Sequence, residues 1–171
     1  MPSRLYGSFG IWLLAATVWG VSPPLPVGSQ FQVNTYTTNS QSFPAISLDA
    51  DGDFAVVWES WGSSLGDTWF DSVHARRYAA DGLPQASPFQ VNTYTTSYQN
   101  SVAISLDADG DFVVVWQSYG SSGGDTSNWS IQAQRWAAEG TPQGAQFQVN
   151  TFTTGYQTSP AIAMQADGDF V

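Results

Sequence analysis

Residues 49–58 read Asp-Ala-Asp-Gly-Asp-Phe-Ala-Val-Val-Trp, and residues 107–116 repeat them with valine in place of the second alanine. Asp-Gly is a strong signal for a two-residue hairpin turn, because a type I′ turn needs positive φ at both central residues. In the apolar run that follows, Phe54, Val56 and Trp58 fall on one face of a strand and Ala55 and Val57 on the other. A strand that is apolar on both faces predicts packing partners above and below its sheet.

The same spacing of 58 residues runs through the rest of the chain. Phe-Gln-Val-Asn-Thr begins at residues 31, 89 and 147, and 37 of 58 positions are identical between residues 31–88 and 89–146. Similarity at a fixed period indicates one structural unit repeated in tandem. We therefore divide residues 30–171 into repeat 1 (31–88), repeat 2 (89–146) and a partial repeat 3 (147–171).

Four strands are expected in each unit, and in the first unit they cover Ala45–Asp49, Asp53–Ser60, Ser72–Ala79 and Phe89–Tyr94. The chain is therefore predicted to be all-β, with tandem four-stranded antiparallel sheets stacked like the blades of a β-propeller. Because a propeller takes about 4–8 blades, the array should be incomplete, and the sequence is expected to be a fragment of a longer reading frame. Apolar sheet faces left open at the ends of such an array should drive association.

The order of these segments resembles a known kind of repeat. Pro-Ala-Ile (44–46), the aspartate-rich turn, Ile-Gln-Ala-Gln-Arg-Trp (131–136) and Phe-Gln-Val-Asn-Thr follow one another as in repeats of large secreted or surface-attached bacterial proteins. The layout is also similar to that of NHL-type propeller blades. The resemblance covers the chain from residue 30 onward. It implies an extracellular array module used in binding or adhesion, with neighbouring repeats as packing partners.

The first 29 residues predict export. Arg4 precedes the apolar run Ile11–Val21, and Pro23 and Pro24 end it. The run is shorter than the roughly 20 apolar residues that span a bilayer, so residues 1–29 are predicted to be a signal peptide and a short linker. An uncleaved N-terminal anchor is the alternative. The body of the chain is expected to be secreted or at the cell surface, with no stable membrane insertion after signal cleavage.

Composition narrows the partners and the chemistry that are available. The chain has 14 acidic residues against 4 basic ones and contains no cysteine. A basic stripe for phosphate contacts is therefore missing, which argues against nucleic acid as a partner. Thiolate nucleophiles and cysteine-based metal sites are excluded as well. The remaining partners are an unknown protein or a carbohydrate.

The acidic turns are the candidate metal sites. Carboxylates suit calcium, which takes 6–8 oxygen ligands. In a two-residue turn, however, Asp49 and Asp53 should point to opposite sides of the hairpin, and the glycine does not stand where an EF-hand has it. A structural turn is therefore preferred and no cofactor is expected, with calcium kept as the alternative. The aspartates concerned are Asp49, Asp51, Asp53, Asp107, Asp109, Asp111, Asp167 and Asp169.

Two further features of the sequence are candidates for a functional role. His74 is the only histidine, and its counterpart one repeat later is Gln132, so we expect a histidine on the surface or on an edge strand rather than a general base. The loop 61–69 carries Trp61 and Trp69 among Gly, Ser and Asp. Their rings would either stack on sugars or cover the edge of the sheet.

These observations favour a protein that is not an enzyme. We expect a non-enzymatic extracellular repeat module for binding or scaffolding, part of a larger secreted or surface protein of bacterial type. One alternative is a calcium-dependent adhesin array. The other is a fragment of a propeller glycosidase, which would need two carboxylates that converge on one pocket.

Overall fold

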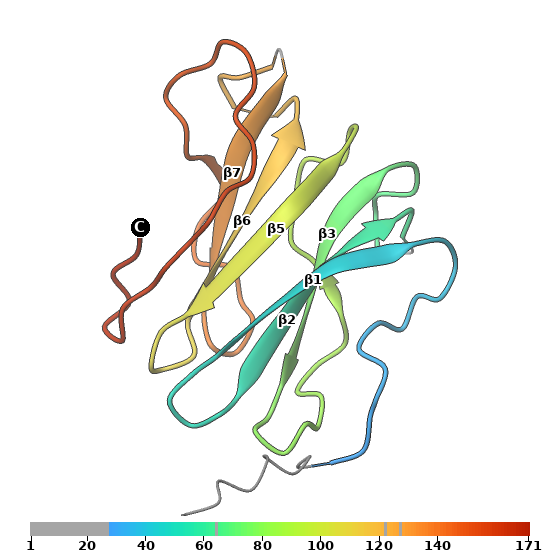
Figure 1. The fold of residues 1–171 in the computed structure, drawn as a ribbon, viewed down its shortest axis with the longest axis vertical. Coiled ribbons are helices and arrows are strands. Elements are labelled where there is room, and N and C mark those ends of the chain that lie inside the picture. The colour runs from blue at the N-terminus through green and yellow to red at the C-terminus, as the bar shows by residue number, and fades with distance from the viewer. Residues whose placement is uncertain (1–27, 64, 122, 127) are drawn as a thin grey trace, which may run out of the picture.

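The computed structural model describes residues 28–63, 65–121, 123–126 and 128–171. Two four-stranded antiparallel sheets follow each other along the chain (Figure 1). The first contains β1 (Gln41–Leu48), β2 (Phe54–Trp61), β3 (Asp71–Tyr78) and β4 (Phe89–Gln90). The second contains β5 (Gln99–Leu106), β6 (Phe112–Tyr119), β7 (Trp129–Trp136) and β8 (Phe147–Gln148). Within each sheet the strands lie in chain order.

The prediction of an all-β chain with two antiparallel four-stranded sheets is confirmed. The layout is compatible with propeller blades, and the described residues form a stack of two sheets rather than a closed ring. Within the described ranges no helix is long and apolar enough to cross a membrane. The predicted signal peptide lies outside the described residues, apart from its last two positions.

The turn between β1 and β2 differs from the predicted two-residue hairpin. Leu48 pairs with Phe54, and beyond this pair the backbone N–H of Asp49 donates to the carbonyl of Asp53 at 2.9 Å. Three residues therefore lie between Asp49 and Asp53, the last hydrogen-bonded positions. Positive φ occurs at Gly52 (89°) and not at Asp51. The prediction of a type I′ turn was wrong, because the carboxylate of Asp49 stabilises a wider turn in which one residue has to be left-handed.

The fourth strand is shorter than predicted because a side chain replaces its backbone bonds. β4 ends at Gln90, whereas the sequence suggested a strand to Tyr94. The Oδ1 atom of Asn92 accepts the backbone N–H of Val73 at 2.8 Å, and its Nδ2 donates to the carbonyl of Tyr94 and to Oε1 of Gln99. Asn92 therefore ends the pairing with β3 and fastens the connection to β5 at the same point.

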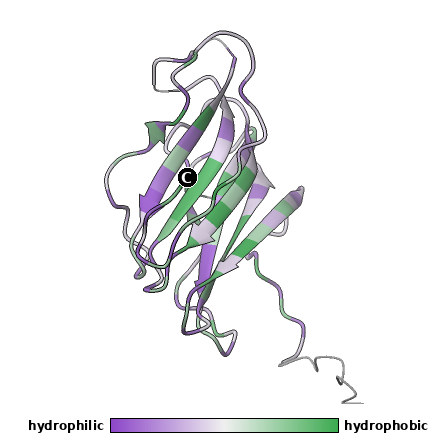
Figure 2. Ribbon diagram, turned by 60° about the vertical axis from the view of Figure 1, so that its left-hand side comes forward, coloured by the Kyte–Doolittle hydropathy of each residue, from purple (hydrophilic) through white to green (hydrophobic). Residues whose placement is uncertain are grey.

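The two faces of each sheet differ in side-chain size. We call the face with the larger side chains the leading face; in the first sheet it carries Ile46, Leu48, Phe54, Val56 and Trp58, and in the second Ile104, Leu106, Phe112, Val114 and Trp116. The opposite, trailing face carries small and β-branched residues, which are Ala45, Ser47, Ala55 and Val57 in the first sheet and Ala103, Ser105, Val113 and Val115 in the second. Green, apolar stretches run along the strands of both sheets in Figure 2, while the loops are paler or purple.

The main hydrophobic core lies between the sheets. It joins the trailing face of the first sheet, including Ala55 and Val57, to the leading face of the second, including Phe112, Val114 and Trp116. A second cluster covers the trailing face of the second sheet, where Ile162 and Met164 of the partial third unit pack against Val113, Val115 and Ala133. The third unit thus repeats the same contact, although its described residues contain a single bridge, Met164 to Phe170, in place of a strand pair.

Candidate functional site

The three aspartate turns lie at one end of the stack, where Figure 1 shows them as the teal, yellow and dark red loops. In the first turn, Oδ1 of Asp49 accepts the backbone N–H groups of Asp51 at 2.9 Å and of Asp53 at 3.0 Å. In the second, Oδ1 of Asp107 accepts those of Asp109 and Asp111 at 3.0 and 2.9 Å. The first aspartate of each of these turns therefore stabilises the turn itself.

The last aspartate of the turn binds a different part of its own sheet. Asp53 Oδ1 accepts a hydrogen bond from the backbone N–H of Ala80 at 2.9 Å, and its Oδ2 accepts one from Nε2 of Gln85 at 2.6 Å. Gln85 in turn accepts a hydrogen bond from Nη2 of Arg77 at 2.6 Å. Asp111 repeats the first two bonds with Ala138 and Gln143. The connection between β3 and β4 is held to the hairpin in the same way in both units.

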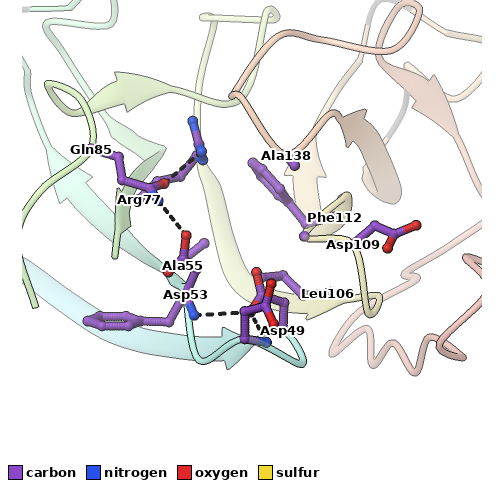
Figure 3. A pocket seen from close by; sticks show the side chains of 12 residues that line it. Asp49, Asp53, Ala55, Arg77, Gln85, Leu106, Asp109, Phe112 and Ala138 are labelled. Atoms are coloured by element: carbon purple, nitrogen blue, oxygen red, sulfur yellow. Dashed lines mark hydrogen bonds between the residues drawn. The ribbon is translucent and has the colours of Figure 1, made fainter. Parts of the chain in front are cut away.

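Successive turns approach each other closely enough to form a shared groove (Figure 3). A Cβ atom on Gly110 would lie 3.0 Å from Oδ2 of Asp49, and one on Gly168 would lie 3.2 Å from Oδ2 of Asp107. Glycine is needed at these places for two reasons, the positive φ of 89° at each and the neighbouring carboxylate. We call this space the turn groove. In the first copy it is lined by Asp49, Asp51, Asp53, Arg77, Gln85 and Asp109, and by apolar residues of both sheets.

The expectation that Asp49 and Asp53 diverge was wrong, because both line the turn groove. The wider turn brings them to one side, yet each carboxylate accepts hydrogen bonds from separate partners. Burial lowers the pKa of Arg77, whose guanidinium also lines the groove, and this positive charge disfavours a cation there. Within the described part of the chain, no three acidic, histidine or cysteine side chains are grouped so that they could hold a metal ion.

His74 is not on the surface, so that prediction was wrong. It lies on β3, between β2 and β4, and is 2 % exposed. Its Nε2 is 2.9 Å from the hydroxyl of Ser72, and burial lowers its pKa to about 4. In the second sheet Gln132 Nε2 donates to Ser130 at the same 2.9 Å. The Ser–His pair is therefore one version of a contact repeated in both sheets, and Ser72 is fully buried.

An aromatic ladder crosses from one sheet to the other at the end opposite the turns. Its members in spatial order are Trp61, Phe70, Tyr98, Trp129 and Tyr119, with ring centroids 6.3, 4.8, 6.5 and 5.3 Å apart. These spacings are within the range of favourable aromatic pairs. Trp61 and Tyr119 remain 40 % and 43 % exposed. The ladder therefore supplies a ring surface that spans two repeats and is open to solvent.

The sequence singled out Trp61 and Trp69 of this region, and the structure separates them. Trp61 belongs to the ladder, whereas Trp69 lies outside it and is 78 % exposed. Tyr98 was missed although it bridges the two sheets through contacts with Phe70 and Trp129. Its recurrence as Tyr156 one repeat later was the available signal.

A buried carboxyl group lies where the two sheets meet. Glu59 on β2 is 4 % exposed, and its Oε1 accepts the backbone N–H of Ser101 on β5 at 2.6 Å. Burial raises the pKa of Glu59 to about 7, a rise to which the negative charge of Asp71 adds. The equivalent residue, Gln117, accepts the N–H of Ser159 at 3.0 Å. The same contact between units is thus made once by a titratable group and once by a neutral amide.

Comparison with known proteins adds no family to these observations. No protein-family model matches this chain, and no curated protein matches it either. The turn groove and the aromatic ladder are therefore the two surfaces that bear on function.

Proposed function

We propose that this chain is a non-enzymatic extracellular repeat module that binds a partner along the aromatic ladder. The observation that carries the proposal is the continuity of the ladder from Trp61 to Tyr119 across two units. Stacking repeats extends such a surface in steps, which suits an extended partner with repeating faces. Aromatic rings offer flat apolar area with polar edges, so a polysaccharide fits this surface better than a compact protein does.

Four aspartates of the first two turns have structural partners. Asp49 and Asp107 stabilise turns, and Asp53 and Asp111 hold the β3–β4 and β7–β8 connections. These contacts recur in both units, which is expected of residues whose role is to stabilise the fold. A glycosidase fragment would need two carboxyl groups aimed at one substrate position. This supports a binding role over hydrolysis.

Affinity electrophoresis tests the proposal with soluble neutral polysaccharides such as mixed-linkage β-glucan, xylan and galactomannan cast into native gels. We expect at least one of them to slow migration of the unaltered protein, and Trp61→Ala or Tyr119→Ala to weaken binding about tenfold, equivalent to about 1.4 kcal/mol. Trp69→Ala is the matched control, since that tryptophan is more exposed but lies outside the ladder. Thermal melting of each variant confirms that the fold persists.

Three results would overturn the proposal. Migration unaffected by any polysaccharide in the panel would remove carbohydrate as the partner class. Release of reducing ends from a polysaccharide over time would show that the chain is catalytic. A loss of binding in Trp69→Ala equal to that in Trp61→Ala would place the site in the loop rather than on the ladder.

A further inference from the structure

The aromatic ladder has an acidic half in the first unit and a neutral half in the second. Asp71 on β3 pairs with Trp61 on β2, so the two side chains lie next to each other on the same face of the sheet. At the equivalent place in the second sheet, Trp129 pairs with Tyr119. A ligand that lies along the ladder therefore meets a carboxylate beside Trp61 and a second ring beside Tyr119.

The carboxylate of Asp71 is available to accept hydrogen bonds from a ligand. The side chain is half-buried, and this burial raises its pKa. Among the described residues, no hydrogen-bond donor or basic side chain is paired with it. A carboxylate that has lost part of its hydration without gaining a donor is costly to the fold. A ligand that brings a donor to this position would recover that free energy.

Two further carboxyl groups lie near Asp71, so negative charge is concentrated in this half of the ladder. Burial raises the pKa of Glu59 and of Asp67, and in both cases the negative charge of Asp71 adds to the rise. The arginines of the first sheet, Arg76 and Arg77, lie at the opposite end of β3, near the turns. Within the described part of this sheet, the three carboxyl groups therefore have no nearby positive charge.

Asp67 gives an independent indication that a donor is missing in this region. It is 2 % exposed, and its Oδ2 is buried without a hydrogen-bond partner among the described residues. Its Oδ1 accepts the backbone N–H of Trp69 at 3.4 Å, which places the carboxyl beside the start of β3. In the second unit the equivalent oxygen, Oδ2 of Asp125, accepts a hydrogen bond from Nδ2 of Asn150 at 3.4 Å. Buried acceptors without a donor are rare in proteins, and this one belongs to the acidic half of the ladder.

We propose that the acidic half of the ladder binds the protonated amino group of a sugar, and that the ligand is a polysaccharide of amino sugars with free amines. This inference rests on the proposed function and names the class of polysaccharide. Asp71 accepts hydrogen bonds from the ammonium group, and the Trp61 ring stacks on the sugar that carries it. Charge complementarity selects this occupant, because an ammonium group forms charge-assisted hydrogen bonds with carboxylates and is attracted to ring faces.

Two hexasaccharides with the same backbone test the proposal. They are the hexamers of glucosamine and of N-acetylglucosamine, which differ only in whether the amine is free or acetylated. Quenching of tryptophan fluorescence at slightly acidic pH, where the free amines are protonated, gives both Kd values. We expect the glucosamine hexamer to bind about tenfold more tightly, as one charge-assisted hydrogen-bonded pair provides. Trp61→Ala should weaken binding of both hexamers, since the ring stacks on either sugar.

Asp71→Asn isolates the contribution of the carboxylate, because it removes the charge and keeps the size of the side chain. We expect the tenfold preference for the glucosamine hexamer to fall below about twofold in this variant. Asp81→Asn is the matched control, since it makes the same change in net charge at an exposed position on the β3–β4 connection. Its amide oxygen can still accept the N–H of Leu83. This control should keep the preference, and thermal melting shows whether both variants fold.

The possible failures can be told apart. Equal binding of the two hexamers would overturn this inference and leave polysaccharide binding by the ladder intact. Binding of neither hexamer, when a neutral polysaccharide slows migration in the gels, would exclude amino sugars and keep the proposed function. An equal loss of preference in Asp71→Asn and Asp81→Asn would assign the preference to overall charge. Displacement of the glucosamine hexamer by hexalysine at equal amine concentration would overturn the inference in favour of a basic peptide.

Discussion

The two sheets have nearly the same sequence, yet equivalent residues have different surroundings. In the second sheet Trp116 and Phe112 are almost fully buried and belong to the core shared with the first sheet. In the first sheet Trp58 and Val56 are buried within a smaller cluster, and Ile46 and Leu48 on the same face remain exposed. Local sequence thus determines the strands and turns, while the neighbouring unit determines how much stability each side chain contributes.

The largest difference is expected at the isoleucine pair. Ile104→Ala should lower the free energy of unfolding by about 2–5 kcal/mol, because it opens a cavity between the sheets. Ile46→Ala should cost less than about 0.5 kcal/mol, since that side chain is mostly in solvent. Urea unfolding of the two variants at low protein concentration measures both values. Equal losses would mean that the two leading faces are equally covered.

A second comparison concerns the asparagine that fastens successive units. Asn92→Ala should cost about 1–3 kcal/mol, because it leaves the buried N–H of Val73 without the acceptor that it has at 2.8 Å. Asn34→Ala should cost less, since Asn34 is more exposed and its side chain bonds are to Tyr36 and Gln41. Thermal melting compares them. A larger loss of stability in Asn34→Ala would show that this asparagine stabilises contacts within one unit rather than between units.

The glutamate and glutamine pair predicts a pH effect. The folded-state pKa of Glu59, about 7, lies above the ordinary 4.5 because of burial, so the folded protein binds an extra proton between these values. The stability that protonated Glu59 contributes is therefore fully present below about pH 4.5 and is lost as the pH rises through 7. Glu59→Gln copies Gln117 and should stabilise the protein at pH 8 by about 1–2 kcal/mol. Melting at pH 5 and pH 8 measures this gain, and a gain of the same size at both pH values would contradict the assignment.

Calcium is expected to have the smallest effect. The carboxylates of Asp49 and Asp107 already accept two backbone N–H groups each, and Arg77 lines the turn groove together with Asp49. The melting temperature should therefore be the same in millimolar calcium and in millimolar magnesium. A rise of several degrees in calcium alone would support the adhesin alternative, since a ligand at 100 times its Kd adds about 2.7 kcal/mol.

The strands could be predicted from the sequence, but the hydrogen-bond and packing partners of individual side chains could not. The alternation around Phe54–Trp58 predicted a strand with neighbours on both faces, which β2 has. The side chains of Asp49 and Asn92 changed the local result, because each competes with backbone pairing in a way that residue periodicity does not encode. The aromatic ladder was only partly foreseen, because its rings come from both units and meet through the stacking of the sheets.

One double variant tests whether the two sheets stack as described. Ser47→Cys combined with Leu106→Cys places two thiols on facing strands, where the Ser47 hydroxyl and the Leu106 N–H are now 3.0 Å apart. We expect an efficient cross-link within one chain at low protein concentration, found by mass spectrometry of the monomer. Ser47→Cys combined with Leu83→Cys should give none. Failure of the first pair to link, or equal linking by the control, would contradict the stacked arrangement.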